Sequence, residues 1–214
     1  MVTMKIKAII FDVDGVLIDS NRIIIDLFKE TAKKMKLKVP SDEDVIKLMG
    51  QSLEENIKFL WPDSDVEIFA KKYREEFVKI KIPIFEGTIE AIEELKKSGF
   101  KLGIVSGKKG FYLEKNLKDA DFKLELFDVI ISAEDTKEHK PSPKPILIAC
   151  DKIGVKPTEI VYVGDARFDY EAAKAAKANF VAVNHGLLSE KELKNFGVKN
   201  IIKSVSDLPK FLKA

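Results

Sequence analysis

Cysteine is nearly absent from this chain, which has one, Cys150, among its 214 residues. A lone cysteine cannot form an internal disulfide, and a chain of this length is long enough to bury a full core. Cys150 follows Ala149 and precedes a helix-like Asp-Lys-Ile segment. This setting favours a small buried apolar group over a nucleophile.

Long apolar runs and an excess of charge are also missing. No stretch approaches the length of a membrane span, and the apolar part of the amino terminus is too short for a signal peptide. The 37 Lys and Arg nearly balance the 35 Asp and Glu, giving a net charge of +2. Nothing in this balance points to nucleic acid or to an anionic membrane, so we expect a soluble cytoplasmic protein.

The chain divides into a helical part and an alternating part. Helices are predicted over residues 21–36, from 42, over 53–60 and over 66–80, and no buried strand is predicted between 18 and 82. Strands over 100–105, 127–132, 160–163 and 180–183 then alternate with helices, and a short edge strand is expected at 201–202. We predict an α/β fold with a doubly wound parallel sheet, formed by residues 1–17 and 83–214, and an all-helical insert at 18–82.

The first strand ends in two acids. Residues 8–11 are continuously apolar, as in a strand buried on both faces, and Asp12 and Asp14 follow before Gly15. Residues i and i+2 of a strand share a face, so the two carboxylates would leave the sheet side by side. A calcium loop is excluded: it needs an oxygen ligand, Gly and Glu at its fifth, sixth and twelfth positions, which here hold Val16, Leu17 and Ile23. An ordinary Asp-rich turn stays open.

The longer string decides between these interpretations. Residues 11–20 read Phe-Asp-Val-Asp-Gly-Val-Leu-Ile-Asp-Ser, which resembles the first motif of the haloacid dehalogenase superfamily, a group of phosphatases and related enzymes that use an aspartate nucleophile. The family usually has Thr at the position of Val16, although Val also occurs there. The resemblance implies a Rossmann-like core with a helical cap, and three further motifs in a fixed order.

The second motif is Ser106-Gly107-Lys108 at the end of the predicted second strand. A hydroxyl there, with the backbone N–H of Gly107, would bind a phosphate oxygen. The alternative is that Ser106 caps the following helix.

The third motif is the Lys140-Pro141 pair in a loop with three prolines. The prolines restrict the backbone, so the lysine can be held in one direction. The alternative is a rigid surface loop whose charge is incidental.

The fourth motif is an acidic pair, Asp165 and Asp169, after an apolar strand and Gly164. Four residues apart, the two acids would share a helical face. The alternative is an N-cap with a second acid near the helix dipole. All four motifs occur in the family's order, and the chain is similar to the phosphoglycolate phosphatase branch with a helical cap.

The resemblance implies a role for each residue. Asp12 would be the nucleophile and Asp14 the general acid and base. Mg²⁺ would be held by Asp12, by the backbone carbonyl of Asp14 and by Asp165. Ser106, Gly107 and Lys140 would bind the phosphate, and Asp169 would orient Lys140 or metal-bound water.

The implied reaction is hydrolysis of a small phosphomonoester, phosphoglycolate-like or a sugar phosphate, through an aspartyl-phosphate. A sugar phosphomutase is the alternative, followed by a non-catalytic binding protein. For the cap, Arg22, Gln51 and Ser52 are the candidate substrate contacts, chosen from their place in loops or near the hinge. The expected partner is a small phosphorylated metabolite, without nucleic acid or membrane, and the protein would be a monomer or a homodimer.

Overall fold

The computed structural model describes residues 6–185 and 187–213, and its centre is a parallel sheet. The six strands lie in the order β3-β2-β1-β4-β5-β6, and neighbouring strands pair in parallel throughout. They are β1 (Ala8–Phe11), β2 (Lys101–Val105), β3 (Val129–Ile131), β4 (Ile160–Gly164), β5 (Asn179–Val183) and β6 (Ile201–Ile202). The first strand is therefore central, with β2 on one side and β4 on the other.

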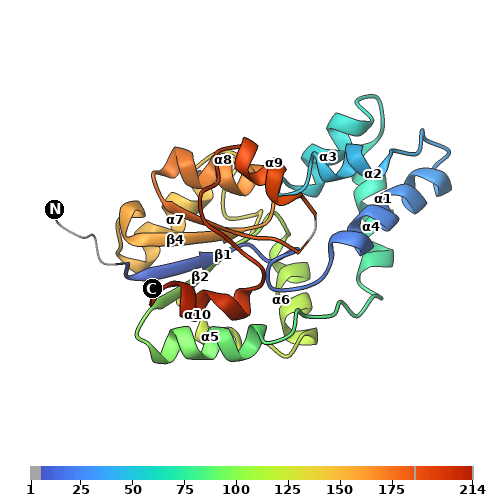
Figure 1. Cartoon of the computed structure of the whole chain (residues 1–214). Helices are drawn as coiled ribbons and strands as arrows, with labels where there is room; N and C mark the ends of the chain where they lie inside the picture. Colours follow the sequence, from blue (N-terminus) through green and yellow to red (C-terminus); the bar gives the residue numbers. More distant parts are fainter. Residues whose placement is uncertain (1–5, 186, 214) are drawn as a thin grey trace.

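Both faces of the sheet are buried. Ile9 and Phe11 belong to one core cluster and Ala8 and Ile10 to the other, as the alternation of side chains along a strand requires. The helices that cover the first face are α5 (Thr88–Lys97), α6 (Gly110–Asp119) and α10 (Leu208–Phe211), and those on the second are α7 (Lys144–Ile153), α8 (Arg167–Ala176) and α9 (Glu190–Asn195). Figure 1 shows these two helical layers around the sheet.

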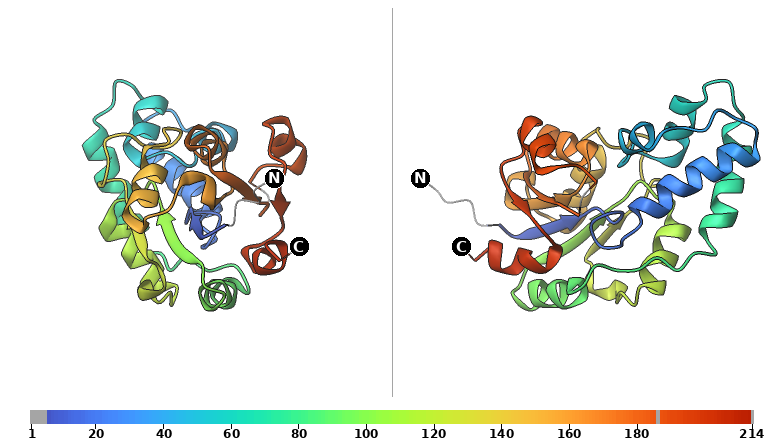
Figure 2. Two further views of the ribbon diagram at one scale, coloured as in Figure 1. Left: turned by 90° about the vertical axis from the view of Figure 1, so that its left-hand side faces the viewer. Right: turned by 45° about the vertical axis from the view of Figure 1, so that its right-hand side comes forward.

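An all-helical cap is inserted after β1. Its helices are α1 (Asn21–Lys34), α2 (Asp42–Ile46), α3 (Leu53–Leu60) and α4 (Val66–Phe77). Phe28, Trp61, Phe69 and Tyr73 form its aromatic centre, with ring centroids 4.7 Å apart for Trp61 and Phe69 and 5.0 Å apart for Phe28 and Tyr73. The right-hand view of Figure 2 places the cap helices beside the sheet rather than in its helical layers.

The two chain segments that join the cap to the core run side by side. Ile18 forms an antiparallel bridge with Ile84, and the N–H of Asp19 donates to the carbonyl of Pro83 over 2.8 Å. The chain therefore leaves and re-enters the core at one place, next to the end of β1.

The predicted fold class is confirmed. The strands lie within one or two residues of the expected ranges, and the α8 helix begins three residues earlier than Tyr170, where the sequence pattern starts it. The short helix α9 was not predicted, because its six residues contain one buried apolar side chain, Leu193. None of the described helices has the length and apolar content that a membrane span requires.

Candidate active site

Three carboxylates meet at the carboxyl ends of β1 and β4. Asp12 follows β1, Asp165 follows β4, and Asp169 lies in the first turn of α8. One oxygen of each lies within 4.8 Å of the others, and all three side chains are buried. Because β1 and β4 are neighbours in the sheet, residues far apart in the sequence are brought to one edge, which is where open α/β sheets bind ligands.

Lys140 places a single ammonium group among these acids. It is 2% exposed, and its Nζ lies 3.0 Å from Oδ1 of Asp12 and 2.6 Å from Oδ1 of Asp169. Asp169 also accepts from the hydroxyl of Tyr162 at 3.3 Å and, through Oδ2, from the N–H of Ala166 at 3.1 Å. Both oxygens of Asp169 are thus engaged, and this carboxylate holds Lys140 against Asp12.

The charges at this edge do not balance. Burial raises the pKa of Asp12 to about 7, Lys140 opposes that shift, and the charges of Asp169 and Asp14 add to it. Burial also raises the pKa of Asp165 well above its ordinary range. For Lys140, burial acts to lower the pKa, but the charges of Asp12 and Asp169 outweigh it and hold the pKa well above its ordinary value. One cation therefore compensates only part of the negative charge.

The carboxylate oxygens at this edge are suitable ligands for a small divalent cation. Buried carboxylate oxygens are hard ligands of the type that Mg²⁺ prefers, and two of the acids have raised pKa values that a cation would relieve. Asn21 donates to Oδ2 of Asp165 over 2.8 Å, while its own Oδ1 is buried and has no hydrogen-bond partner among the described residues. A Cβ on Gly15 would lie 2.0 Å from Oδ2 of Asp165, so only glycine fits beside this carboxylate.

Asp14 points to different partners. Its carboxylate accepts from the hydroxyl of Ser20 and pairs with the ammonium group of Lys108. Asp12 and Asp14 nevertheless line the same pocket, although β1 itself ends at Phe11. Lys108 in turn lies over the ring of Phe77, with Nζ 5.0 Å from the centroid.

Ser106 and Gly107 follow β2 on the other side of β1. The interpretation of Ser106 as the cap of the next helix is wrong, since α6 begins at Gly110 and its N-cap is Lys109. The Ser106 hydroxyl accepts instead from the N–H of Lys108 over 3.2 Å. Gly107 touches the cap: a Cβ there would lie 2.6 Å from the carbonyl oxygen of Gln51. The cap therefore reaches the core directly at the site.

The three candidate cap contacts have different positions. Gln51 lines the pocket. Ser52 is the N-cap of α3, and its hydroxyl is used in a reciprocal capping box with Glu55. Arg22 lies outside the lining of the pocket: its side chain is 64% exposed and pairs with Asp26 at 2.5 Å and Asp42 at 2.7 Å. One residue along a helix turns the side chain by about 100°, so the neighbouring Asn21 faces the site instead.

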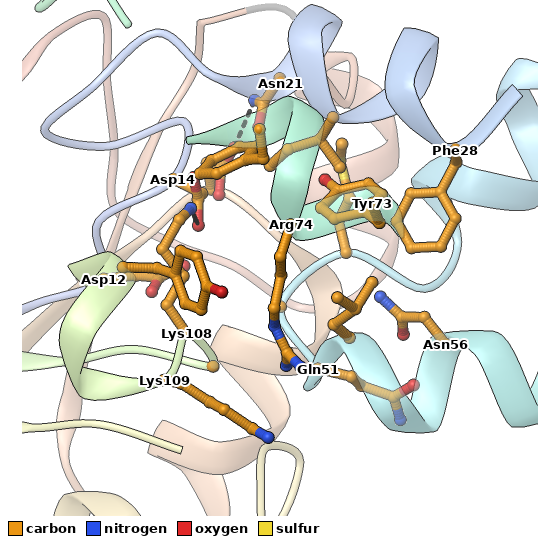
Figure 3. Close-up of a pocket in the computed structure, with 18 residues that line it drawn as sticks. Asp12, Asp14, Asn21, Phe28, Gln51, Asn56, Tyr73, Arg74, Lys108 and Lys109 are labelled. Carbon is orange, nitrogen blue, oxygen red and sulfur yellow. Dashed lines mark hydrogen bonds and ion pairs between the residues drawn. The ribbon is translucent and has the colours of Figure 1, made fainter. Parts of the chain in front are cut away.

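A pocket of about 90 Å³ connects Asp12 and Asp14 with the cap. Figure 3 shows Asp12 and Asp14 at one end of the view and Asn56 at the other, with Arg74 between them. Sequence analysis assigned no role to several lining residues, because their partners are distant in the chain. They are Asn21, Asn56, Tyr73, Arg74, Lys108 and Lys109.

Comparison with known proteins agrees with this architecture. The chain is 32% identical over 208 residues to pyrophosphatase PpaX of Bacillus cereus, covering 96% of this chain and 95% of that protein. A structure from Lactobacillus plantarum, provisionally named a phosphoglycolate phosphatase, superposes with a TM-score of 0.84 at 26% identity, covering 97% and 99% of the two chains. Another from Bacteroides vulgatus, provisionally named a β-phosphoglucomutase, gives 0.85 at 26%, covering 98% and 88%.

A parallel sheet with a buried aspartate and lysine at its carboxyl edge, under a helical cap, defines a class of enzymes that act on phosphate groups. The chain belongs to the haloacid dehalogenase-like hydrolase family, whose sequence profile matches residues 9–183. It is an enzyme of the phosphatase type within that family.

Proposed function

We propose that the protein is a Mg²⁺-dependent phosphatase in which Asp12 attacks the phosphorus atom of a small phosphorylated compound. The observation that carries this proposal is Asp12 itself, buried at the tip of β1, 3.0 Å from Lys140 and lining a pocket shared with Asp14. In the first step an Oδ–P bond forms as the P–O bond to the leaving group breaks. In the second step water breaks the aspartyl-phosphate and releases phosphate.

Asp14 supplies and recovers the proton. It would protonate the leaving oxygen in the first step and take a proton from the attacking water in the second. Ser20 and Lys108 hold its carboxylate in place, so the group is oriented before the substrate arrives. This assignment also explains why Asp12 and Asp14 need different partners: one carboxylate attacks while the other transfers protons.

Charge neutralisation falls to Lys140, with Ser106 and the backbone N–H of Gly107 as further phosphate-binding groups. Asp169 positions Lys140 through the 2.6 Å contact. Asp12, the backbone carbonyl of Asp14 and Asp165 would hold Mg²⁺, which when bound would neutralise the phosphate and lower the pKa of the buried acids.

The division of the chain follows from the same arrangement. We assign residues 1–17 and 83–214 to the catalytic core and 18–82 to the cap, because the two connecting segments meet at the Ile18–Ile84 bridge.

The names of the relatives make pyrophosphate and phosphoglycolate the first substrates to test. Since such compounds are intracellular metabolites, we place the enzyme in the cytoplasm, as a monomer or homodimer.

The test is release of inorganic phosphate from p-nitrophenyl phosphate, with and without Mg²⁺. We expect Asp12→Asn to abolish turnover, because an amide is not a nucleophile of comparable strength. Asp63→Asn, at an exposed position of the cap, is the matched control and should retain activity. If Asp12→Asn kept the native rate, the assignment of the nucleophile would be refuted.

A phosphomutase is the second candidate, because the neighbour from Bacteroides vulgatus carries that name at a TM-score of 0.85. A mutase would keep its phosphoenzyme until a sugar phosphate accepts the phosphoryl group, and it would need a bisphosphate activator. Rapid release of phosphate without an activator favours the phosphatase. Inactivity on every phosphoester tried would favour a binding protein.

A further inference from the structure

Three ionic side chains form a cluster on the wall of the pocket, away from the carboxylates. Glu54, near the start of α3, accepts from Arg74 of α4 at 2.7 Å and from Lys109 of the core at 3.0 Å. Arg74 and Lys109 both line the pocket. The cluster spans the boundary between cap and core, so it is complete only when the cap lies on the core as it does here.

The cluster has a positive charge to spare, since two cations share one carboxylate. Burial acts to raise the pKa of Glu54, but Arg74 and Lys109 outweigh it and hold the pKa below its ordinary value. Arg74 is 13% exposed, and its guanidinium lies 5.5 Å from the ring centroid of Tyr112. A guanidinium that is shielded and held in this way binds an anion more strongly than a mobile surface side chain does.

Asn56 is an independent sign of a ligand in the same pocket. Its side chain lines the pocket, the residue is 7% exposed, and its Oδ1 has no hydrogen-bond partner within the described part of the chain. A buried polar atom without a partner is costly, so such atoms are normally satisfied by water or by a ligand. A bound molecule that extends from Asp12 toward Arg74 would meet this group as well.

We propose that Arg74 and Lys109 bind a second anionic group of the substrate, so that the enzyme selects small phosphorylated compounds with an anionic tail over neutral ones. The inference rests on the proposed function of Asp12. Glu54 is the internal counter-ion that keeps the two cations in place and shares them with the incoming anion. The substrate class is then a compact molecule with a transferable phosphoryl group at one end and a carboxylate or phosphate at the other.

The test uses two substrates that differ in tail charge: phosphoglycolate, and its amide, in which the carboxylate is replaced by a carboxamide. We expect the native enzyme to prefer phosphoglycolate in kcat/KM, and Arg74→Gln to reduce that preference about tenfold or more. Arg74→Lys keeps the charge and should retain most of the preference. Arg167→Gln is the matched control: it removes an exposed Arg–Glu pair, also at 2.7 Å, that does not line the pocket.

Loss of rate on both substrates by the same factor in Arg74→Gln would overturn the inference, because a structural role changes both reactions equally. Equal native rates on the two substrates would also overturn it. Binding of both compounds to Asp12→Asn, measured by calorimetry, separates this inference from the proposed function. The native protein could be inactive and still bind phosphoglycolate more tightly than the amide, with this preference lost in Arg74→Gln. The proposed phosphatase function would then be refuted, and the anion site would be supported. Equal binding of both compounds rejects the anion site.

Discussion

Replacing Lys140 by Met is the perturbation that tests the electrostatics of the site most directly. The substitution keeps a long unbranched side chain but removes the ammonium group that lies between Asp12 and Asp169. Three buried carboxyl groups, those of Asp12, Asp165 and Asp169, then share the site without a lysine to compensate them. We expect the folded protein to lose stability, in addition to activity.

The distances set the size of the effect. With an effective dielectric constant of about 20, contacts of 3.0 and 2.6 Å correspond to attractions of about 5.5 and about 6.4 kcal/mol. The net loss is smaller, because the variant no longer desolvates an ammonium group and its acids can take up protons. Breaking a buried pair costs about 3–5 kcal/mol. For a chain of this size that lowers Tm by about 6–20 °C.

The loss depends on pH in a defined direction. Without Lys140 the pKa values of Asp12 and Asp165, already raised by burial, rise further. At pH values above the ordinary pKa of Asp, the folded variant then binds more protons than its unfolded chain does. Its free energy of unfolding therefore falls as the pH rises from the ordinary pKa of Asp through the raised pKa values. The deficit relative to the native protein should be larger at pH of about 8 than at about 6.

Thermal unfolding followed by circular dichroism measures the loss at both pH values. Lys137→Met, at an exposed position of the same loop, is the control and should change stability by less than about 0.5 kcal/mol. Mg²⁺ should recover part of the Tm of Lys140→Met, because a cation replaces the missing charge. A Lys140→Met protein that melts within about 2 °C of the native one at pH of about 8 would refute the reasoning.

Two further predictions follow from the site. The rise in Tm on adding Mg²⁺ should grow from pH of about 5.5 to about 8. Protons compete with the cation for Asp12, whose pKa burial raises to about 7. A rise in Tm that is independent of pH would contradict this prediction. Gly107→Ala should lower kcat/KM about tenfold with little change in Tm, since its Cβ would lie 2.6 Å from the Gln51 carbonyl and force the cap away. Gly110→Ala, whose Cβ would have an ordinary 3.6 Å contact, is the control.

The parts of the site that sequence analysis predicted are those attached to strand ends. Asp12 and Asp165 each follow an apolar run that can only be a buried strand, and the order of a doubly wound sheet then brings neighbouring strand ends together. Lys140 was found from the Lys-Pro pair of the family, and the structure brings its ammonium group to Asp12. Local pattern and topology were sufficient for these residues.

The remaining contacts depend on long-range packing. Lys108 reaches Asp14 across 94 positions of the sequence, and Asn21 reaches Asp165 across 144. Arg22 was chosen from its place near the hinge, yet the phase of α1 turns its side chain to solvent. That phase is set by the packing of Phe28 and its neighbours against α4, which no short segment contains. The sequence does not distinguish Arg74 from the other Lys and Arg residues, 37 in all, because its place in the pocket depends on how the cap packs on the core.

Strand order also explains how a nearly neutral chain builds a polarised site. The net charge of +2 gives no hint of it. Around β1, however, the lysines Lys108 and Lys140 come from the segments after β2 and β3, whereas Asp165 and Asp169 come from the segment after β4. Asp12 thus has cations supplied from one side and carboxylates from the other. We infer that a phosphate group would be drawn to the first side and a metal cation to the second, with the attacking oxygen between them.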